Sequence, residues 1–321
     1  MIQVAVPSTA VEFVMVAEAG ILEAQALLLV ESIRRFTGVH SRSRITVVSP
    51  RRDRRPSRST LRALERLEAE YRPIHVDSCC AEYGTSYRVH SLARIEPGSG
   101  PDIIVQLDSD TVFLGEPDLT LGDHEAAARP VDMKGMCTAG PGDSFNAYWR
   151  AICQLADVDY DQFPTVTSTV DREHVKASHN GGLIIARRSH GLFTRTEELL
   201  RSMVVSGHKP WGDQSPILDT GTGLLSGAAT AHWGTSQAAF SLACAAARVS
   251  VRALPASHNF PLHLVELMAR PLPLPLVHVH YHRMFTAGAG VSNPLIDGSI
   301  AIAADAAEWL RARLPLHPTT S

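Results

Sequence analysis

The sequence lacks most of the features that mark secreted, membrane-spanning or nucleic-acid-binding proteins. Its 321 residues include only five cysteines, whose spacing fits neither a metal site nor a disulfide framework, and this favours a reducing, cytoplasmic environment. The formal net charge of -3 provides no overall positive field for nucleic acid. No apolar run is long enough to span a bilayer, and the N-terminus does not resemble a signal peptide, so we expect no integral membrane segment.

Glycine-rich phosphate-binding loops are also missing. Neither Gly-x-Gly-x-x-Gly nor a Walker pattern follows the first predicted strand. A phosphate group would therefore have to be bound in another way, for example by a metal ion. Strand-like and helix-like segments nevertheless alternate: strands are predicted at 12–17, 44–48, 72–76 and 103–107, and helices at 21–36, 59–71 and 86–95. This alternation predicts an α/β fold with a mostly parallel, Rossmann-like central sheet flanked by helices.

The chain beyond Pro117 is less regular. Strands are predicted at 125–133, 177–187, 249–254 and 276–282, helices at 193–205, 235–248 and 299–314, and loop-rich segments at 137–178 and 206–234. We expect one large domain with two abutting halves, 1–118 and 119–314, followed by a flexible tail at 315–321.

Two aspartates mark the most informative stretch. The apolar strand 103–107 ends at Asp108-Ser109-Asp110, and ligands of open α/β sheets bind at the carboxyl ends of strands. Two carboxylates so close repel each other, so a divalent cation is expected between them. Asp and Ser also favour turns, and the same residues satisfy the nucleophile pattern of a haloacid-dehalogenase-type phosphatase, in which Asp108 would attack phosphorus.

Three histidines follow much later in the chain. Alternation along the strand 276–282 places His278, His280 and His282 on one face. Neutral imidazole is a good ligand for Mn²⁺ or Zn²⁺, although a single histidine near a strand end is more often a hydrogen-bonded polar group. Three on one face favour a metal site.

In this order, the motifs resemble a metal-dependent glycosyltransferase of the GT-A fold, closest to family 8, the retaining group that includes glycogenin and galactosyltransferases. The resemblance covers roughly residues 10–285 and rests on the ordered set of motifs. Its parts are the strand with Asp-Ser-Asp, the segment 179–185 (His-Asn-Gly-Gly-Leu-Ile-Ile), the segment 234–259 ending in Leu-Pro-Ala-Ser-His-Asn, and the histidine strand.

The resemblance implies roles for particular residues. Mn²⁺, or Mg²⁺, would be bound by Asp108, Asp110 and His280, with His278 as the alternative to His280. The donor, a nucleotide-diphosphate sugar, would contact Glu18, Arg88, Asp108, Ser109 and Arg283. Gln237, Asp132 and Asn180 would act at the reacting sugar, with Gln214 as the alternative to Gln237. An inverting reaction would instead need a base, for which Asp132, Asp143 and Asp213 are the candidates.

The implied reaction moves a sugar from a UDP-sugar, or a GDP-sugar, to a hydroxyl of a small-molecule or glycan acceptor with retention. Residues 1–118 would bind the donor and 119–314 the acceptor. Ser236 stands where the family has Asp, and the family's Lys-Pro-Trp after the histidine strand is missing. A non-catalytic sugar-nucleotide-binding protein is therefore a further alternative. A nucleic-acid partner is not expected, and a homodimer is compatible with the sequence.

Overall fold

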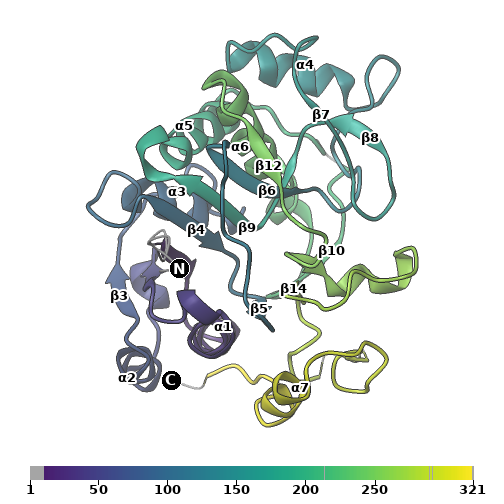
Figure 1. Cartoon of the computed structure of the whole chain (residues 1–321). Helices are drawn as coiled ribbons and strands as arrows, with labels where there is room; N and C mark the ends of the chain where they lie inside the picture. The colour runs from purple at the N-terminus through teal and green to yellow at the C-terminus, as the bar shows by residue number, and fades with distance from the viewer. Residues whose placement is uncertain (1–10, 213, 289, 291, 320–321) are drawn as a thin grey trace, which may run out of the picture.

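A computed structural model describes residues 11–212, 214–288, 290 and 292–319 (Figure 1). Its main sheet has seven strands: β1 Val11–Val16, β2 Arg44–Ser49, β3 Glu70–Pro73, β4 Ile103–Leu107, β6 Ala126–Pro130, β9 His179–Arg187 and β12 Val251–Ala253. The helices are α1 Ile21–Phe36, α2 Arg58–Arg66, α3 Thr85–Ile95, α4 Asn146–Leu155, α5 Leu192–Val205, α6 Thr235–Ala246 and α7 Ala304–Arg311.

Smaller elements surround this sheet. A three-stranded sheet contains β5 Thr111–Phe113, β13 Phe260–Pro261 and β14 His278–His280, and two hairpins consist of β7 Thr165–Thr167 with β8 His174–Lys176 and of β10 Leu218–Thr220 with β11 Gly223–Leu225. Short 3-10 turns lie at Gly38–His40, Arg52–Arg54, Arg188–His190, Gly227–Ala229 and Leu262–Leu267.

The main sheet is mostly parallel, as predicted. Its strand order is β12-β6-β9-β4-β1-β2-β3, and only β9 runs antiparallel to both of its neighbours. β6, β9 and β12 come from 119–314, so the sheet is continuous across the predicted boundary between the halves. The proposed division at 118 and the tail at 315–321 remain predictions, although Leu316 is buried and its N–H donates to the Phe285 carbonyl at 2.6 Å.

Helices cover both faces of the main sheet because its strands are apolar on both sides. On β1, Phe13 and Met15 point into a cluster with Leu29 and Ile33 of α1. Val14 points the other way, into a cluster that includes residues of α3, α5 and α6. This alternation has the period of two that a strand imposes, and it confirms the predicted α/β architecture.

Several element boundaries differ from the predictions. The helix predicted at 59–71 ends at Arg66, because Glu68 adopts a left-handed φ of 53° and Tyr71 pairs with Val47 in the sheet. The strand predicted at 72–76 is accordingly β3, and the helix predicted at 299–314 is the shorter α7. The segments predicted as loops contain α4 and the β10–β11 hairpin, because tertiary packing stabilises elements with weak local signals.

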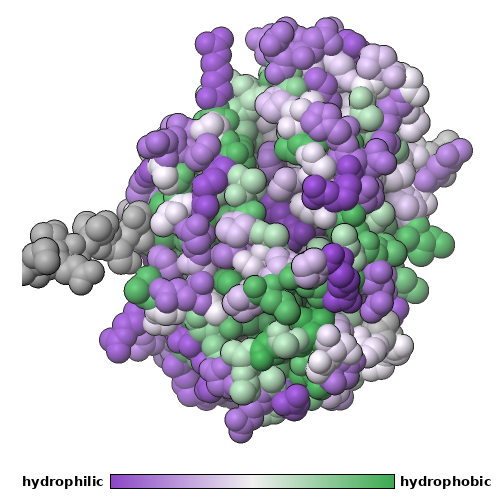
Figure 2. Space-filling model, turned by 45° about the vertical axis from the view of Figure 1, so that its right-hand side comes forward, coloured by the Kyte–Doolittle hydropathy of each residue, from purple (hydrophilic) through white to green (hydrophobic). Residues whose placement is uncertain are grey.

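The surface of the protein carries both hydrophilic and hydrophobic residues (Figure 2). Figure 2 shows one face, on which hydrophilic residues dominate the upper part and hydrophobic residues are more frequent in the lower part, at the level of α7 in Figure 1. Within the described residues, no helix combines the length and apolar character needed to cross a membrane.

Candidate active site

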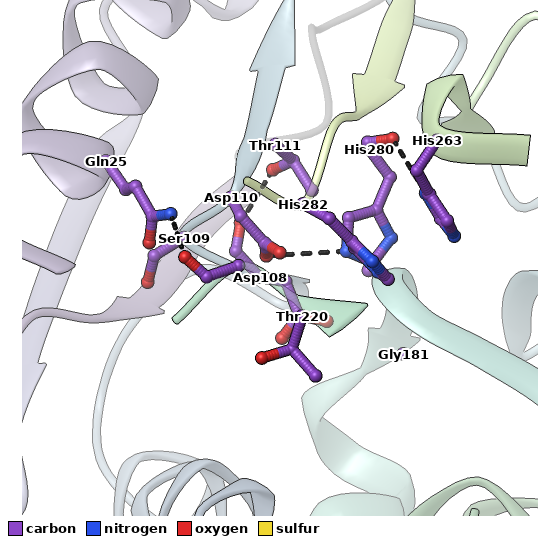
Figure 3. Close-up of polar contacts among 12 residues, drawn as sticks. Gln25, Asp108, Ser109, Asp110, Thr111, Gly181, Thr220, His263, His280 and His282 are labelled. Atoms are coloured by element: carbon purple, nitrogen blue, oxygen red, sulfur yellow. Dashed lines mark hydrogen bonds and ion pairs between the residues drawn. The ribbon is translucent and has the colours of Figure 1, made fainter. Parts of the chain in front are cut away.

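Asp110 and His280 meet because β5 and β14 pair in the small three-stranded sheet. The Asp-Ser-Asp turn connects β4 to β5, and β5 pairs antiparallel with β14 so that Thr111 lies opposite His280. The His280 Nε2 consequently lies 3.4 Å from Asp110 Oδ1, and the two side chains point toward each other in Figure 3. The two motifs singled out in the sequence, far apart in the chain, therefore form one site.

Asp108 turns toward a different partner. Arg88, on α3, donates a short hydrogen bond from Nη1 to Asp108 Oδ1 and another to the Gly181 carbonyl at 3.3 Å. Burial acts to lower the pKa of Arg88, but Asp108 outweighs it and raises the value. Ser109 donates its hydroxyl to the Val16 carbonyl, which ties the turn to the end of β1. Asp108 thus lies beside the Asp110 site with an arginine partner of its own.

A potential metal site consists of Asp110, His280 and His282, whose ligand atoms all lie within 4.8 Å of one another. His278 lies outside it: its ring packs on Phe113 with centroids 4.5 Å apart, and its Nδ1 accepts from the Asn259 N–H at 3.2 Å. One carboxylate and two imidazoles suit Mn²⁺ and other transition-metal ions, so the residues present fit the expected cation.

The protonation states of Asp110 and His280 depend on their close contact with each other. Burial acts to raise the pKa of Asp110, but His280 outweighs it and holds the pKa below its ordinary value. Burial likewise acts to lower the pKa of His280, but Asp110 raises it. Burial lowers the pKa of His282 to about 4. At neutral pH, Asp110 is therefore ionised and His282 neutral, which are the forms that coordinate a cation.

Asp132 and Asn180 form a second buried group behind the site. Asn180 Nδ2 donates to Asp132 Oδ2 at 2.5 Å, and Thr169 donates to the other carboxylate oxygen at 3.0 Å. Asn180 Oδ1 accepts from the Gly182 N–H and from Asn259 Nδ2, both at 2.9 Å. Burial raises the pKa of Asp132 above its ordinary value. These contacts connect the start of β9 to the segment before β13.

Gln237 and Gln214 lie in different surroundings. Gln237, on α6, lines a small cavity together with Arg88, Gln106, Gly181 and Ser236. Gln214 is exposed, and its N–H donates to the Trp211 carbonyl at 2.9 Å. The structure therefore brings Gln237, and not Gln214, to the arginine that holds Asp108.

Asp143, considered as a base, and Glu18, considered as a donor contact, each have a partner of their own. Asp143 lies 2.9 Å from Lys134 Nζ, and Asp213 lies outside the described residues. Glu18 is buried and forms an ion pair with Arg51, in which Nε donates to Oε1 at 2.8 Å. These contacts are structural, and a donor that uses Glu18 would have to share it with Arg51.

A model of one protein family matches residues 13–217, more than half of the chain. The description of that family is "Rhodobacterales glycosyltransferase domain". The chain belongs to the Rhodobacterales glycosyltransferase domain family. The match includes Arg88, the Asp-Ser-Asp turn and Asn180, and it ends before the β10–β11 hairpin. It confirms the predicted glycosyltransferase activity and supersedes the phosphatase alternative.

Three solved structures of other glycosyltransferases are similar to this chain. An active-site mutant of LgtC, with glutamate in place of glutamine, has a TM-score of 0.51 at 13% identity, covering 96% of this chain and 97% of that chain. LgtC, a galactosyltransferase in complex with donor and acceptor sugar analogs, has a TM-score of 0.49 at 14% identity, with coverage of 96% and 97%. WbbM, a bifunctional glycosyltransferase, has a TM-score of 0.46 at 13% identity, with coverage of 96% and 52%. The first likeness confirms the predicted GT-A fold. No curated protein sequence matches the chain.

The β10–β11 hairpin of this glycosyltransferase covers the potential metal site, which the sequence did not reveal. A Cβ atom placed on Gly221, at the hairpin tip, would lie 2.3 Å from Asp110 Oδ2. Gln25, on α1, donates to the Gly221 carbonyl at 2.8 Å, and Arg283 Nε contacts the two carboxylate oxygens of Asp219 at 2.6 and 2.7 Å. The short Thr-Gly-Thr-Gly turn at 220–223 was the available signal for a hairpin. Nothing in its spacing indicates contact with the aspartate.

Gly182 is a point at which the site tolerates no side chain. A Cβ there would lie 2.4 Å from Asn259 Oδ1 and 2.7 Å from His280 Nδ1. We expect Gly182→Ala to lower the free energy of unfolding by about 1–3 kcal/mol, because both buried side chains would have to shift. Urea denaturation measures this loss. Gly84→Ala is the control, because a Cβ there meets no atom within 4 Å; equal stability of the two variants would contradict the packing described.

Proposed function

We propose that this glycosyltransferase moves a sugar from a nucleotide-diphosphate sugar to a hydroxyl of a small-molecule or glycan acceptor, with retention and with a divalent cation. A UDP-sugar is the preferred donor, with a GDP-sugar as the alternative. The observation that carries the proposal is the approach of Asp110 to His280 at the carboxyl end of β4. In an α/β sheet this is the edge at which ligands bind.

In this proposal, Asp110 and His280 hold Mn²⁺, or Mg²⁺, and Asp108 lies beside them as a further ligand or ribose contact. The cation would supply positive charge to the diphosphate leaving group. Arg88 supports this role, because its partly buried side chain pairs with Asp108 and keeps a guanidinium within the same site. Ser109 and Arg283 are assigned to the donor, although Ser109 donates to the chain and Arg283 pairs with Asp219.

The side chains proposed to act at the reacting sugar are Gln237, Asn180 and Asp132. Gln237 shares a cavity with Arg88, which supports a position near the donor. Asp132 accepts hydrogen bonds on both carboxylate oxygens, so it is better suited to orienting Asn180 than to removing a proton. That arrangement favours retention, which needs no strong base, over an inverting reaction. The division into a donor half and an acceptor half, the cytoplasmic location and the homodimer stay predictions.

A thermal-shift panel of nucleotide sugars, each with and without Mn²⁺, tests the proposal. One UDP- or GDP-sugar is expected to stabilise the protein only when the metal is present, because the metal connects the diphosphate to Asp110. At a ligand concentration of about 100 times the Kd, the stabilisation is about 2.7 kcal/mol, or on the order of 5 °C in Tm. UDP and GDP without a sugar serve as controls for binding by the nucleotide alone.

Two results would contradict the proposal. Equal stabilisation with and without metal would remove the proposed role of the cation. Stabilisation by a nucleotide sugar without any transfer or hydrolysis, across a set of sugar acceptors, would instead favour the non-catalytic alternative.

A further inference from the structure

His282 does not lie where strand alternation predicts it. β14 ends at His280, and His282 adopts a left-handed φ of 49° after the strand. This turn of the backbone, rather than the period of two, brings its ring to the site, where its centroid lies 4.7 Å from that of His280. Residues other than glycine rarely adopt the left-handed region, and histidine is among those that enter it more often than most.

Two contacts fix the orientation of the His282 ring. It stacks on His263, with centroids 3.6 Å apart and planes inclined by 11°, and Figure 3 shows the two rings side by side. Its Nδ1 lies 3.0 Å from the Asp219 carbonyl oxygen, which can only accept a hydrogen bond. The proton of a neutral ring is therefore on Nδ1, and Nε2 keeps its lone pair. A backbone carbonyl on one nitrogen is the usual outer contact of a histidine that binds metal through the other.

The carbonyl that orients His282 belongs to the hairpin that covers the site. The hairpin is attached on two sides, through Gln25 to α1 and through Arg283 to the segment after β14. Its strand β11 is little packed elsewhere, since Leu224 is 66% exposed, and Ile217, just before the hairpin, is 75% exposed. The two attached residues, Gly221 and Asp219, are also the ones that lie next to Asp110 and His282.

We propose that His282 is a metal ligand through Nε2, so that two imidazoles and the Asp110 carboxylate bind the cation. This ligand set favours Mn²⁺, and the transition metals that follow it in the first row, over Mg²⁺. This inference rests on the proposed function, and it adds a nitrogen ligand to the set implied by the sequence. Mg²⁺ strongly prefers oxygen ligands, whereas imidazole suits transition metals, so the second imidazole acts on metal selectivity.

His282→Asn is the variant that isolates the ligand. Asparagine tolerates the left-handed backbone and keeps a side-chain N–H for the Asp219 carbonyl, but it has no group in the place of Nε2. Mn²⁺ and Mg²⁺ are titrated into the full chain by calorimetry, alone and with saturating UDP or GDP. Co²⁺ absorption spectra report the ligand set independently of activity. His174→Asn, at an exposed histidine of β8, is the matched control, and circular dichroism checks that each variant is folded.

We expect His282→Asn to weaken Mn²⁺ binding by about 10- to 100-fold, to change Mg²⁺ binding by less than about threefold, and to alter the Co²⁺ spectrum. His174→Asn should match the unchanged protein. If His282→Asn binds Mn²⁺ as tightly as the unchanged protein while Asp110→Asn does not, His282 is not a ligand and the proposed function stands. If the unchanged protein binds none of these cations, even with nucleotide, both proposals fail.

Discussion

Asp110→Asn is expected to reduce metal-dependent donor turnover by more than about 100-fold while leaving the protein folded. The substitution keeps the size of the side chain and the backbone carbonyl that accepts from the Tyr281 N–H at 3.1 Å. It removes the negative charge that faces His280 at 3.4 Å. A cation would lose its only carboxylate in the group of three ligands, because Asp108 is paired with Arg88.

Initial rates of donor hydrolysis or transfer, measured across a Mn²⁺ series, test this expectation. Asp123→Asn, at an exposed loop position, is the matched control for loss of one carboxylate. The variants should have similar far-UV circular dichroism. A turnover rate of Asp110→Asn within threefold of the control would contradict the assignment of Asp110 as a metal ligand.

Arg88→Met is expected to lower the free energy of unfolding by about 1–3 kcal/mol, the cost of leaving a partly buried carboxylate without its charged hydrogen-bond partner. Methionine replaces much of the arginine's length but leaves the Asp108 carboxylate beside the Gly181 carbonyl without its cation. The arginine is closely enclosed, since a Cβ on Gly181 would lie 2.5 Å from its Nη2. Donor binding should also fall, because the guanidinium proposed to contact the phosphates is gone.

A double-mutant cycle with Asp108→Asn separates the pair from other effects. In the double variant no charge is left unpaired, so its stability should be higher than the sum of the two single losses predicts, by about 0.5–3 kcal/mol. Urea denaturation of the four proteins gives the coupling. Strict additivity would show that the short Arg88–Asp108 contact contributes nothing.

The sequence by itself determined the strands, most helices and the place of the aspartates. Alternating strands and helices imply a parallel sheet, and a short β-branched run such as 103–107 forms a buried strand whatever surrounds it. Because ligands bind at the carboxyl edge of such sheets, the Asp-Ser-Asp turn could be assigned to a site before its partners were known. The helix prediction was wrong where strand pairing outweighed a weak helical pattern. Tyr71 was predicted in a helix, but it pairs with Val47 as part of β3.

Only the tertiary structure decided which side chains face each other at the site. The pairing of β5 with β14 places His280 next to Asp110. The packing of α3 on the sheet brings Arg88 into contact with Asp108. Local spacing contains no information on such contacts, because they depend on strand register and helix packing between distant segments. The position of His282 was also decided by the folded chain, because its left-handed backbone places it outside the strand alternation that the sequence predicted. The contact of the hairpin tip with Asp110 likewise depends on how distant segments pack, and not on local spacing.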